Sequence, residues 1–134
     1  MNRLFNAAIF LAILSPLSAN AATYLCVVEA AAIVEDGGNR PATAGVAKLT
    51  RDKYLLTRGD AGWRVRELGM DYDLFDKCST NDLDPPAVCE RSGDSYTGTF
   101  VFFKDQRFNF TGMMLTNGRD QLIAAKGRCS KVQL

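Results

Sequence analysis

The feature that most constrains the fold is a set of four cysteines, Cys26, Cys78, Cys89 and Cys129, all downstream of an N-terminal segment typical of export. An even number of cysteines in an exported chain favours structural disulfides over metal or redox chemistry. Several pairings are possible. We predict Cys26 with Cys129, which joins the two ends of the domain, and Cys78 with Cys89, which closes one polar excursion. A zinc site needs closely spaced ligands, and neither Cys26 nor Cys129 has a neighbouring Cys or His.

Residues 1–21 have the composition of a cleavable signal peptide. Arg3 supplies a positive start, an apolar run over residues 4–17 follows, and an Ala-Asn-Ala sequence ends at Ala21. The apolar run is shorter than the roughly 20 residues needed to span a bilayer. We therefore predict a cleaved signal helix over 1–21, then a single periplasmic or secreted domain over 22–134 with no membrane attachment. A retained N-terminal anchor is the alternative.

The charge balance gives the domain no electrostatic preference for nucleic acid. The whole chain has 16 Lys and Arg against 15 Asp and Glu. Arg3 is the one charged residue of the signal segment, so 16 − 1 = 15 cations remain against 15 acids. A formally neutral domain has no electrostatic reason to seek nucleic acid or an anionic membrane.

The absence of histidine excludes most familiar reaction centres. Without histidine the chain has no Ser-His-Asp or Cys-His centre and no histidine metal site, and oxidised cysteines are not nucleophiles. We predict no catalytic residue, no metal and no cofactor.

Carboxylate chemistry is the remaining possibility. The aspartates gather in one polar stretch, namely Asp71, Asp73, Asp76, Asp82 and Asp84. Two carboxylates at the right separation hydrolyse glycosides, and closely spaced oxygens bind calcium. Ser, Thr, Asn and Pro residues around them indicate an exposed loop, whereas a general acid needs a desolvated carboxyl group. We interpret the stretch as solvated loop acids and leave calcium binding open.

Short apolar runs separated by turn residues predict an all-β domain. The expected strands cover residues 24–29, 46–49, 54–57, 63–68, 97–103, 107–115 and 120–126, and residues 30–34 either extend the first strand or form a short helix. We therefore expect a single antiparallel barrel or sandwich of about seven or eight strands. We make no prediction about the oligomeric state.

Alternation of side chains indicates which faces are buried. Trp63 and Val65 share one face of their strand, and Arg64 and Arg66 share the other, as in a half-buried antiparallel strand. In the final third, Phe100 and Phe102 share a face, as do Phe108 and Phe110. We expect these aromatic pairs to pack across a hairpin.

One short motif suggests a binding mode. Residues 92–96 read Ser-Gly-Asp-Ser-Tyr, which resembles the Ser-Gly-x-x-Tyr motif of the periplasmic lysozyme inhibitors, small exported β-barrels that insert a loop into the lysozyme cleft. The resemblance implies that Ser92 and Tyr96 bind the catalytic carboxylates of the enzyme. That family's second motif, Tyr-x-x-x-Thr-Lys-Gly, is matched only at Lys126-Gly127. The alternative is that residues 92–94 form a turn and Tyr96 packs in a strand.

The chain also resembles short secreted bacterial proteins of unknown function. The shared features are a hairpin with Trp63, two central cysteines, a Phe-rich hairpin and a final Gly-x-Cys-Ser at residues 127–130. This resemblance implies a fold without implying an activity.

Two functions follow as hypotheses. The first is an exported, non-catalytic binding or inhibitor module that acts through Ser92 and Tyr96 on an enzyme such as lysozyme. The second is a small-ligand-binding β-barrel, or a carboxylate hydrolase of the cell envelope. Convergence of polar groups in an open barrel mouth would favour the second hypothesis.

Overall fold

The computed structural model describes residues 22–36, 42–49, 51–75, 77–79, 85–116 and 118–133. The predicted signal peptide lies outside these residues, as do Asp76, Asp82 and Asp84. The described residues contain strands and turns but no helix. No helix in this part of the chain is therefore long and apolar enough to cross a membrane.

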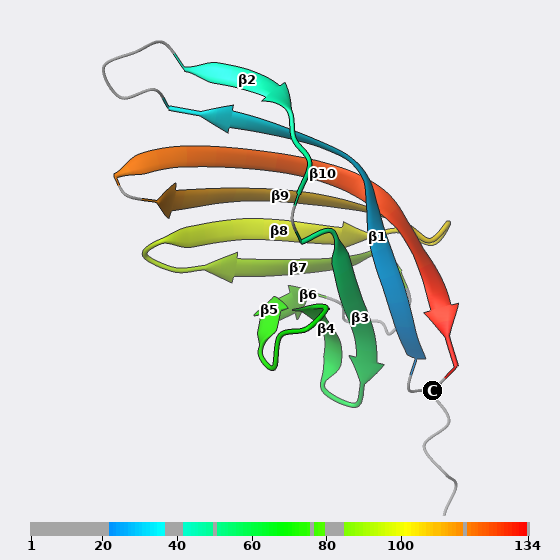
Figure 1. Cartoon of the computed structure of the whole chain (residues 1–134). Helices are drawn as coiled ribbons and strands as arrows, with labels where there is room; N and C mark the ends of the chain where they lie inside the picture. The colour runs from blue at the N-terminus through cyan, green and yellow to red at the C-terminus, as the bar shows by residue number, and fades with distance from the viewer. Residues whose placement is uncertain are drawn as a thin grey trace, which may run out of the picture.

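The described part of the chain forms ten strands (Figure 1). They are β1 (Ala22–Glu35), β2 (Thr43–Val46), β3 (Lys53–Gly59), β4 (Gly62–Glu67), β5 (Asp73–Phe75), β6 (Lys77–Ser79), β7 (Ala87–Ser92), β8 (Tyr96–Phe102), β9 (Arg107–Thr116) and β10 (Arg119–Val132). The all-β prediction is confirmed, but the predicted strand number is too low. The strands β5 and β6 lie in the acidic stretch that was interpreted as an exposed loop, and β7 lies in a segment for which no strand was predicted. The residues around Ala30 that were open to a helical alternative belong to β1.

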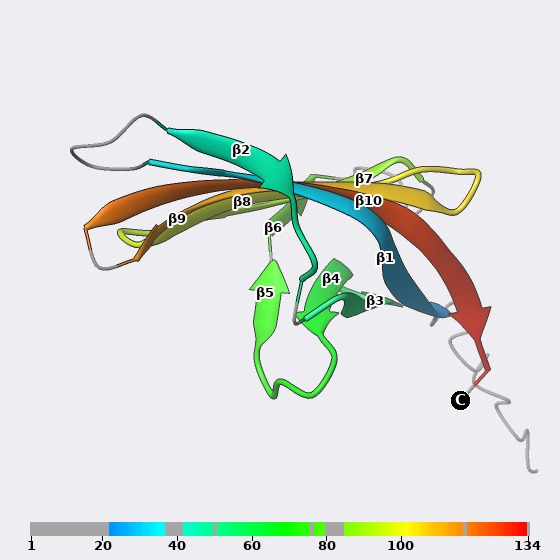
Figure 2. The same ribbon diagram turned by 45° about the horizontal axis from the view of Figure 1, so that its top comes forward.

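All ten strands belong to one antiparallel sheet that curls into a nearly closed barrel. The strand order is β5-β4-β3-β1-β10-β9-β8-β7-β6, and β2 pairs with β1 beside this path. The two ends of the order approach each other, since β4 contacts both β6 and β7 and β5 contacts β7. Figure 2 shows β3, β4 and β5 on one side of the broad sheet that runs from β10 to β7. Of the two predicted architectures, the structure is a barrel.

The strand β1 changes its partner halfway along its length. Its first half pairs with β3 from Ala22 to Val27, and its second half pairs with β2 from Ala32 to Glu35. A register shift against β10 falls between these halves, at Val28 and Ala30. An extra residue of this kind bends a strand and increases its twist. The bend separates β2 from β3 and leaves one side of the barrel open.

The barrel interior is filled by aromatic rings. Phe100 pairs with Phe110 and Phe102 with Phe108 across the β8–β9 hairpin, and all four are at most 5% exposed. The rings of Phe100 and Phe108 stack with centroids 4.9 Å apart. The predicted packing of these faces is thus confirmed.

The opposite wall contributes further large rings to the core. Trp63 and Val65 are buried, as the alternation in this strand predicted. The ring of Trp63 lies 5.6 Å from that of Phe102, and the ring of Tyr54 lies 6.0 Å from that of Phe100. These contacts join the two walls through the middle of the barrel.

Both predicted disulfides are present. Cys26 on β1 is bonded to Cys129 on β10, and Cys78 on β6 is bonded to Cys89 on β7. In each case the two cysteines are direct register partners on neighbouring strands. Such bonds persist in oxidising, extracytoplasmic compartments.

Candidate functional site

A cavity of about 710 Å³ occupies the open end of the barrel. It lies where the second half of β1 diverges from β3, and it is bounded by the segment that connects β2 to β3 and by the inner faces of β8, β9 and β10. Pockets that bind small molecules have volumes of about 300–1,000 Å³. We call this cavity the barrel mouth.

The deep wall of the barrel mouth is apolar. The side chains that form it are Ile33, Leu49, Leu74, Phe110, Met114 and Ile123. They come from four strands and one connection, so the tertiary fold alone brings them together. A wall of this kind removes apolar ligand surface from water at a gain of about 25 cal/mol per Å².

Polar groups converge on the same cavity from β3 and β4. Glu67 follows the buried Trp63 and Val65 on the inner face of β4, and its side chain is 13% exposed. Its carboxylate Oε1 lies 3.2 Å from Nε of Arg51. Burial, together with the charges of Glu67 and Asp52, raises the pKa of Tyr54 to about 12. The hydroxyl group of Tyr54 therefore stays protonated at neutral pH.

Arg91 contributes a cation to the mouth from β7. It occupies the inner-face position after the buried Ala87 and Cys89. Its guanidinium carbon lies 6.0 Å from the centre of the Tyr96 ring, and Nη1 donates to the carbonyl oxygen of Leu74 at 3.4 Å. Among the described residues, no carboxylate forms an ion pair with Arg91.

The two residues of the Ser-Gly-x-x-Tyr motif lie on opposite faces of the sheet. Ser92 is exposed and lines a shallow depression on the outer surface beside Thr97. Tyr96 points inward and lines the barrel mouth. The structure therefore does not bring these two side chains together.

Two glycines make room for the ring of Tyr96. Gly98 and Gly112 are register partners, and a Cβ atom added to either would lie 2.8 Å or 3.1 Å from the Tyr96 hydroxyl oxygen. That oxygen is buried and has no hydrogen-bond partner among the described residues. Burial raises the pKa of this phenol above its usual value. The hydroxyl group is not positioned to contact another protein in this conformation.

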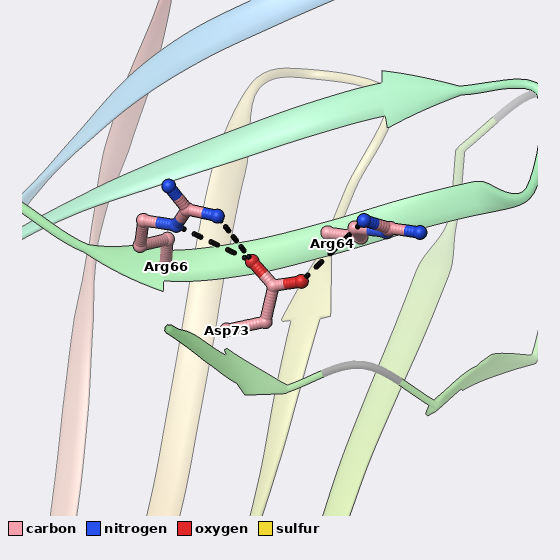
Figure 3. Close-up of polar contacts among 3 residues, drawn as sticks. All are labelled: Arg64, Arg66 and Asp73. Atoms are coloured by element: carbon pink, nitrogen blue, oxygen red, sulfur yellow. Dashed lines mark hydrogen bonds and ion pairs between the residues drawn. The ribbon is translucent and has the colours of Figure 1, made fainter. Parts of the chain in front are cut away.

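The two described acids of the acidic stretch, Asp71 and Asp73, do not line the cavity. Asp73 on β5 lies between two arginines of β4, with Oδ1 3.1 Å from Arg66 and Oδ2 3.7 Å from Arg64 (Figure 3). Asp71 is exposed. The described residues contain no group of three or more side chains able to hold a metal ion. The carboxylate of Asp73 therefore serves as a link between β4 and β5.

The sequence reasoning did not single out Arg91, Glu67 or Tyr54. The alternation of buried and exposed positions along the strands nevertheless indicated Arg91 and Glu67. Arg91 is in phase with the cysteine two residues before it, and Glu67 is in phase with Trp63 and Val65. A charged residue on the buried face of a strand needs a partner or an opening, and here both residues reach the opening.

Comparison of the chain with protein-family models, with curated proteins and with solved structures found no match in any of the three.

Proposed function

We propose that the protein is a non-catalytic binding protein of an oxidising compartment outside the cytoplasm, and that its barrel mouth holds a small, largely apolar molecule. The observation that carries this proposal is the open cavity itself, with its deep apolar wall and its polar groups converging at the opening. Cavities with this composition are the usual form of small-molecule sites.

The polar groups of the mouth favour binding over hydrolysis. A glycosidase needs two carboxyl groups, one of which acts as a proton donor. Glu67 is the one carboxylate among the described residues that line the mouth, and Arg51 pairs with it. A single carboxylate cannot supply the pair of carboxyl groups that this reaction needs.

The position of Tyr96 favours the small-ligand hypothesis over the inhibitor hypothesis. An inhibitor loop requires Ser92 and Tyr96 to project together into the cleft of an enzyme. In the barrel Ser92 faces outward and the hydroxyl group of Tyr96 is buried. Inhibition of lysozyme through this motif would require the start of β8 to leave the sheet.

A dye-binding assay with two methionine variants tests the proposal. The neutral dye N-phenyl-1-naphthylamine becomes fluorescent in apolar cavities and should bind the oxidised protein. Met114→Trp should abolish the signal, because Met114 lines the mouth. Met113→Trp is the matched control, since the side chain of Met113 is 50% exposed and lies on the outer face of the same strand. Circular dichroism should verify that both variants fold.

The proposal fails if the wild-type protein does not bind the dye, or if both variants bind it equally. A parallel arm measures cell-wall lysis by lysozyme in the presence of a micromolar excess of the protein. We expect undiminished lysis. Inhibition that disappears in Tyr96→Phe would instead support the inhibitor hypothesis.

A further inference from the structure

The charges around the barrel mouth are unequal. Its described lining contains the cations Lys48, Arg51 and Arg91 but only one acid, Glu67. Because Arg51 pairs with Glu67, two cations remain without an opposing carboxylate in the cavity. The mouth is therefore an apolar cavity with a positively charged opening.

Arg91 is held in a position that leaves most of its donors available. Its guanidinium group lies over the ring of Tyr96 and makes one long hydrogen bond, to Leu74. A guanidinium group has five N–H donors in a fixed fork that matches carboxylate and phosphate oxygens. The contact with the ring restricts the orientations of the fork, which reduces the entropy that binding would cost.

Among the described residues, the acids near the mouth form no ion pair with Arg91. Asp73, on the strand adjacent to β4, is engaged by Arg64 and Arg66. At the other side of the mouth, Gln121 donates a hydrogen bond to Glu35 at 2.9 Å. Among the described residues, the lining of the mouth therefore carries two cations, Arg91 and Lys48, with which no carboxylate forms an ion pair.

We propose that the ligand of the barrel mouth is an anionic amphiphile, whose carboxylate or phosphate head group binds Arg91 and Lys48 while its apolar chain lies against Phe110, Met114 and Ile123. This inference rests on the proposed function, because it names the chemical class of the molecule that the mouth holds. Neutral apolar molecules would gain the burial of their chain but not the contact with Arg91.

Displacement of the same neutral dye by amphiphiles of equal chain length tests the head group. The competitors are dodecanoate, dodecyl phosphate, dodecanol and dodecyltrimethylammonium, each below its micelle concentration. We expect at least one anion to displace the dye at about a tenfold lower concentration than dodecanol, a preference of about 1.4 kcal/mol. The carboxylate and phosphate arms distinguish a fatty acid from a phospholipid-like ligand.

Two arginine variants identify the contact. Arg91→Gln should remove the preference for the anion and leave dodecanol unchanged. Arg128→Gln is the matched control, because Arg128 is 74% exposed on β10 and pairs with Glu29 outside the mouth. Equal displacement by dodecanol and both anions, or an equal loss of preference in both variants, overturns this inference. Absence of any dye binding overturns the proposed function instead.

Discussion

At the scale of single residues, Gly127 of β10 occupies a position where β1 and the ring of Phe108 leave no room for a side chain. A Cβ atom added there would overlap the backbone carbonyl oxygen of Val27 and lie 2.7 Å from the ring of Phe108. The backbone atom has no rotamer to change, so the strand itself would have to move. The same position lies opposite the register shift that bends β1. A side chain here would therefore disturb the bend that opens the barrel mouth.

We predict that Gly127→Ala lowers the stability of the protein by about 2–3 kcal/mol, the upper part of the range for overpacked cores. In a domain of this size each kcal/mol lowers Tm by roughly 4–8 °C. Differential scanning calorimetry measures the change. Gly45→Ala is the control, because nothing lies within 4 Å of a Cβ atom added at Gly45. Similar Tm values for the two variants would contradict the prediction.

The phenol of Tyr54 makes stability depend on alkaline pH. Its pKa is raised from 10.0 to about 12 in the folded protein, first by burial and then by Glu67 and Asp52. The folded state therefore favours the protonated phenol more strongly than the unfolded state does. The stability that this difference in pKa contributes to the folded state is fully present below pH 10 and is lost as the pH rises from 10 towards 12.

We expect Tm to fall steeply over this interval, and we expect Tyr54→Phe to make the fall shallower because it removes the titrating group. Tyr72→Phe is the matched control, since Tyr72 is 49% exposed. Rapid thermal scans at successive pH values provide the measurement. If Tyr54→Phe loses stability as steeply as the wild-type protein, the assigned role of Tyr54 is wrong.

At the scale of strands, the two disulfides support different parts of the sheet. The bond between Cys26 and Cys129 joins the two longest strands and spans a sequence separation of 103 residues. The bond between Cys78 and Cys89 spans 11 residues and attaches the three-residue edge strand β6 to β7. In the chain-entropy model the longer loop contributes about 4–5 kcal/mol and the shorter one somewhat under 3 kcal/mol.

The double variant Cys26→Ala with Cys129→Ala should consequently lower Tm more than Cys78→Ala with Cys89→Ala. Hydrogen exchange should separate the two cases further. Loss of the second bond should increase exchange mainly in β6, whereas loss of the first should increase exchange along β1 and β10. Equal Tm losses in the two double variants would count against this difference.

The sequence was most informative where strands are long and pair with their neighbours in the chain. The predicted strands over 97–103, 107–115 and 120–126 correspond to β8, β9 and β10. Here the alternation of phenylalanines marks the buried face, and each strand pairs with the next. In these strands the local sequence pattern was therefore sufficient to predict both the strand and its buried face.

The short strands were not predictable in the same way. The strands β5 and β6 have three residues each and lie at the two ends of the strand order. Three residues are too few for a visible alternation, and the polar residues around them are typical of a loop. The predicted strand over 46–49 is also displaced, because β2 ends at Val46 where its pairing with β1 stops. Pairing between distant segments determined these boundaries.

At the scale of the whole molecule, the binding cavity results from the course of β1. The mouth exists because β1 pairs with β3 in one half and with β2 in the other. No segment of the sequence contains that divergence, so the sequence could indicate inward charges such as Arg91 but not the cavity that they line. The choice between a surface loop and a barrel mouth required the arrangement of all strands.

The barrel also has a seam, because β5 and β6 stand at opposite ends of the strand order. Phe75 on β5 is fully buried and closes this seam from within. Its ring lies 6.3 Å from that of Tyr96, 6.1 Å from that of Phe100 and 5.9 Å from that of Phe110. Side-chain packing on the aromatic core thus holds β5 beside the wall that carries Tyr96 and lines the mouth.

We predict that Phe75→Ala costs about 3–5 kcal/mol of stability, as for other buried phenylalanines, and weakens dye binding because the wall beside Tyr96 loses its support. Leu68→Ala is the control, since Leu68 is 48% exposed. Phe75→Leu preserves most of the volume and keeps the test informative if Phe75→Ala does not fold. If the seam and the mouth share a wall, a loss of packing at Phe75 must also affect the cavity. A Phe75→Leu variant with a lower Tm but an unchanged dye affinity would therefore contradict the prediction.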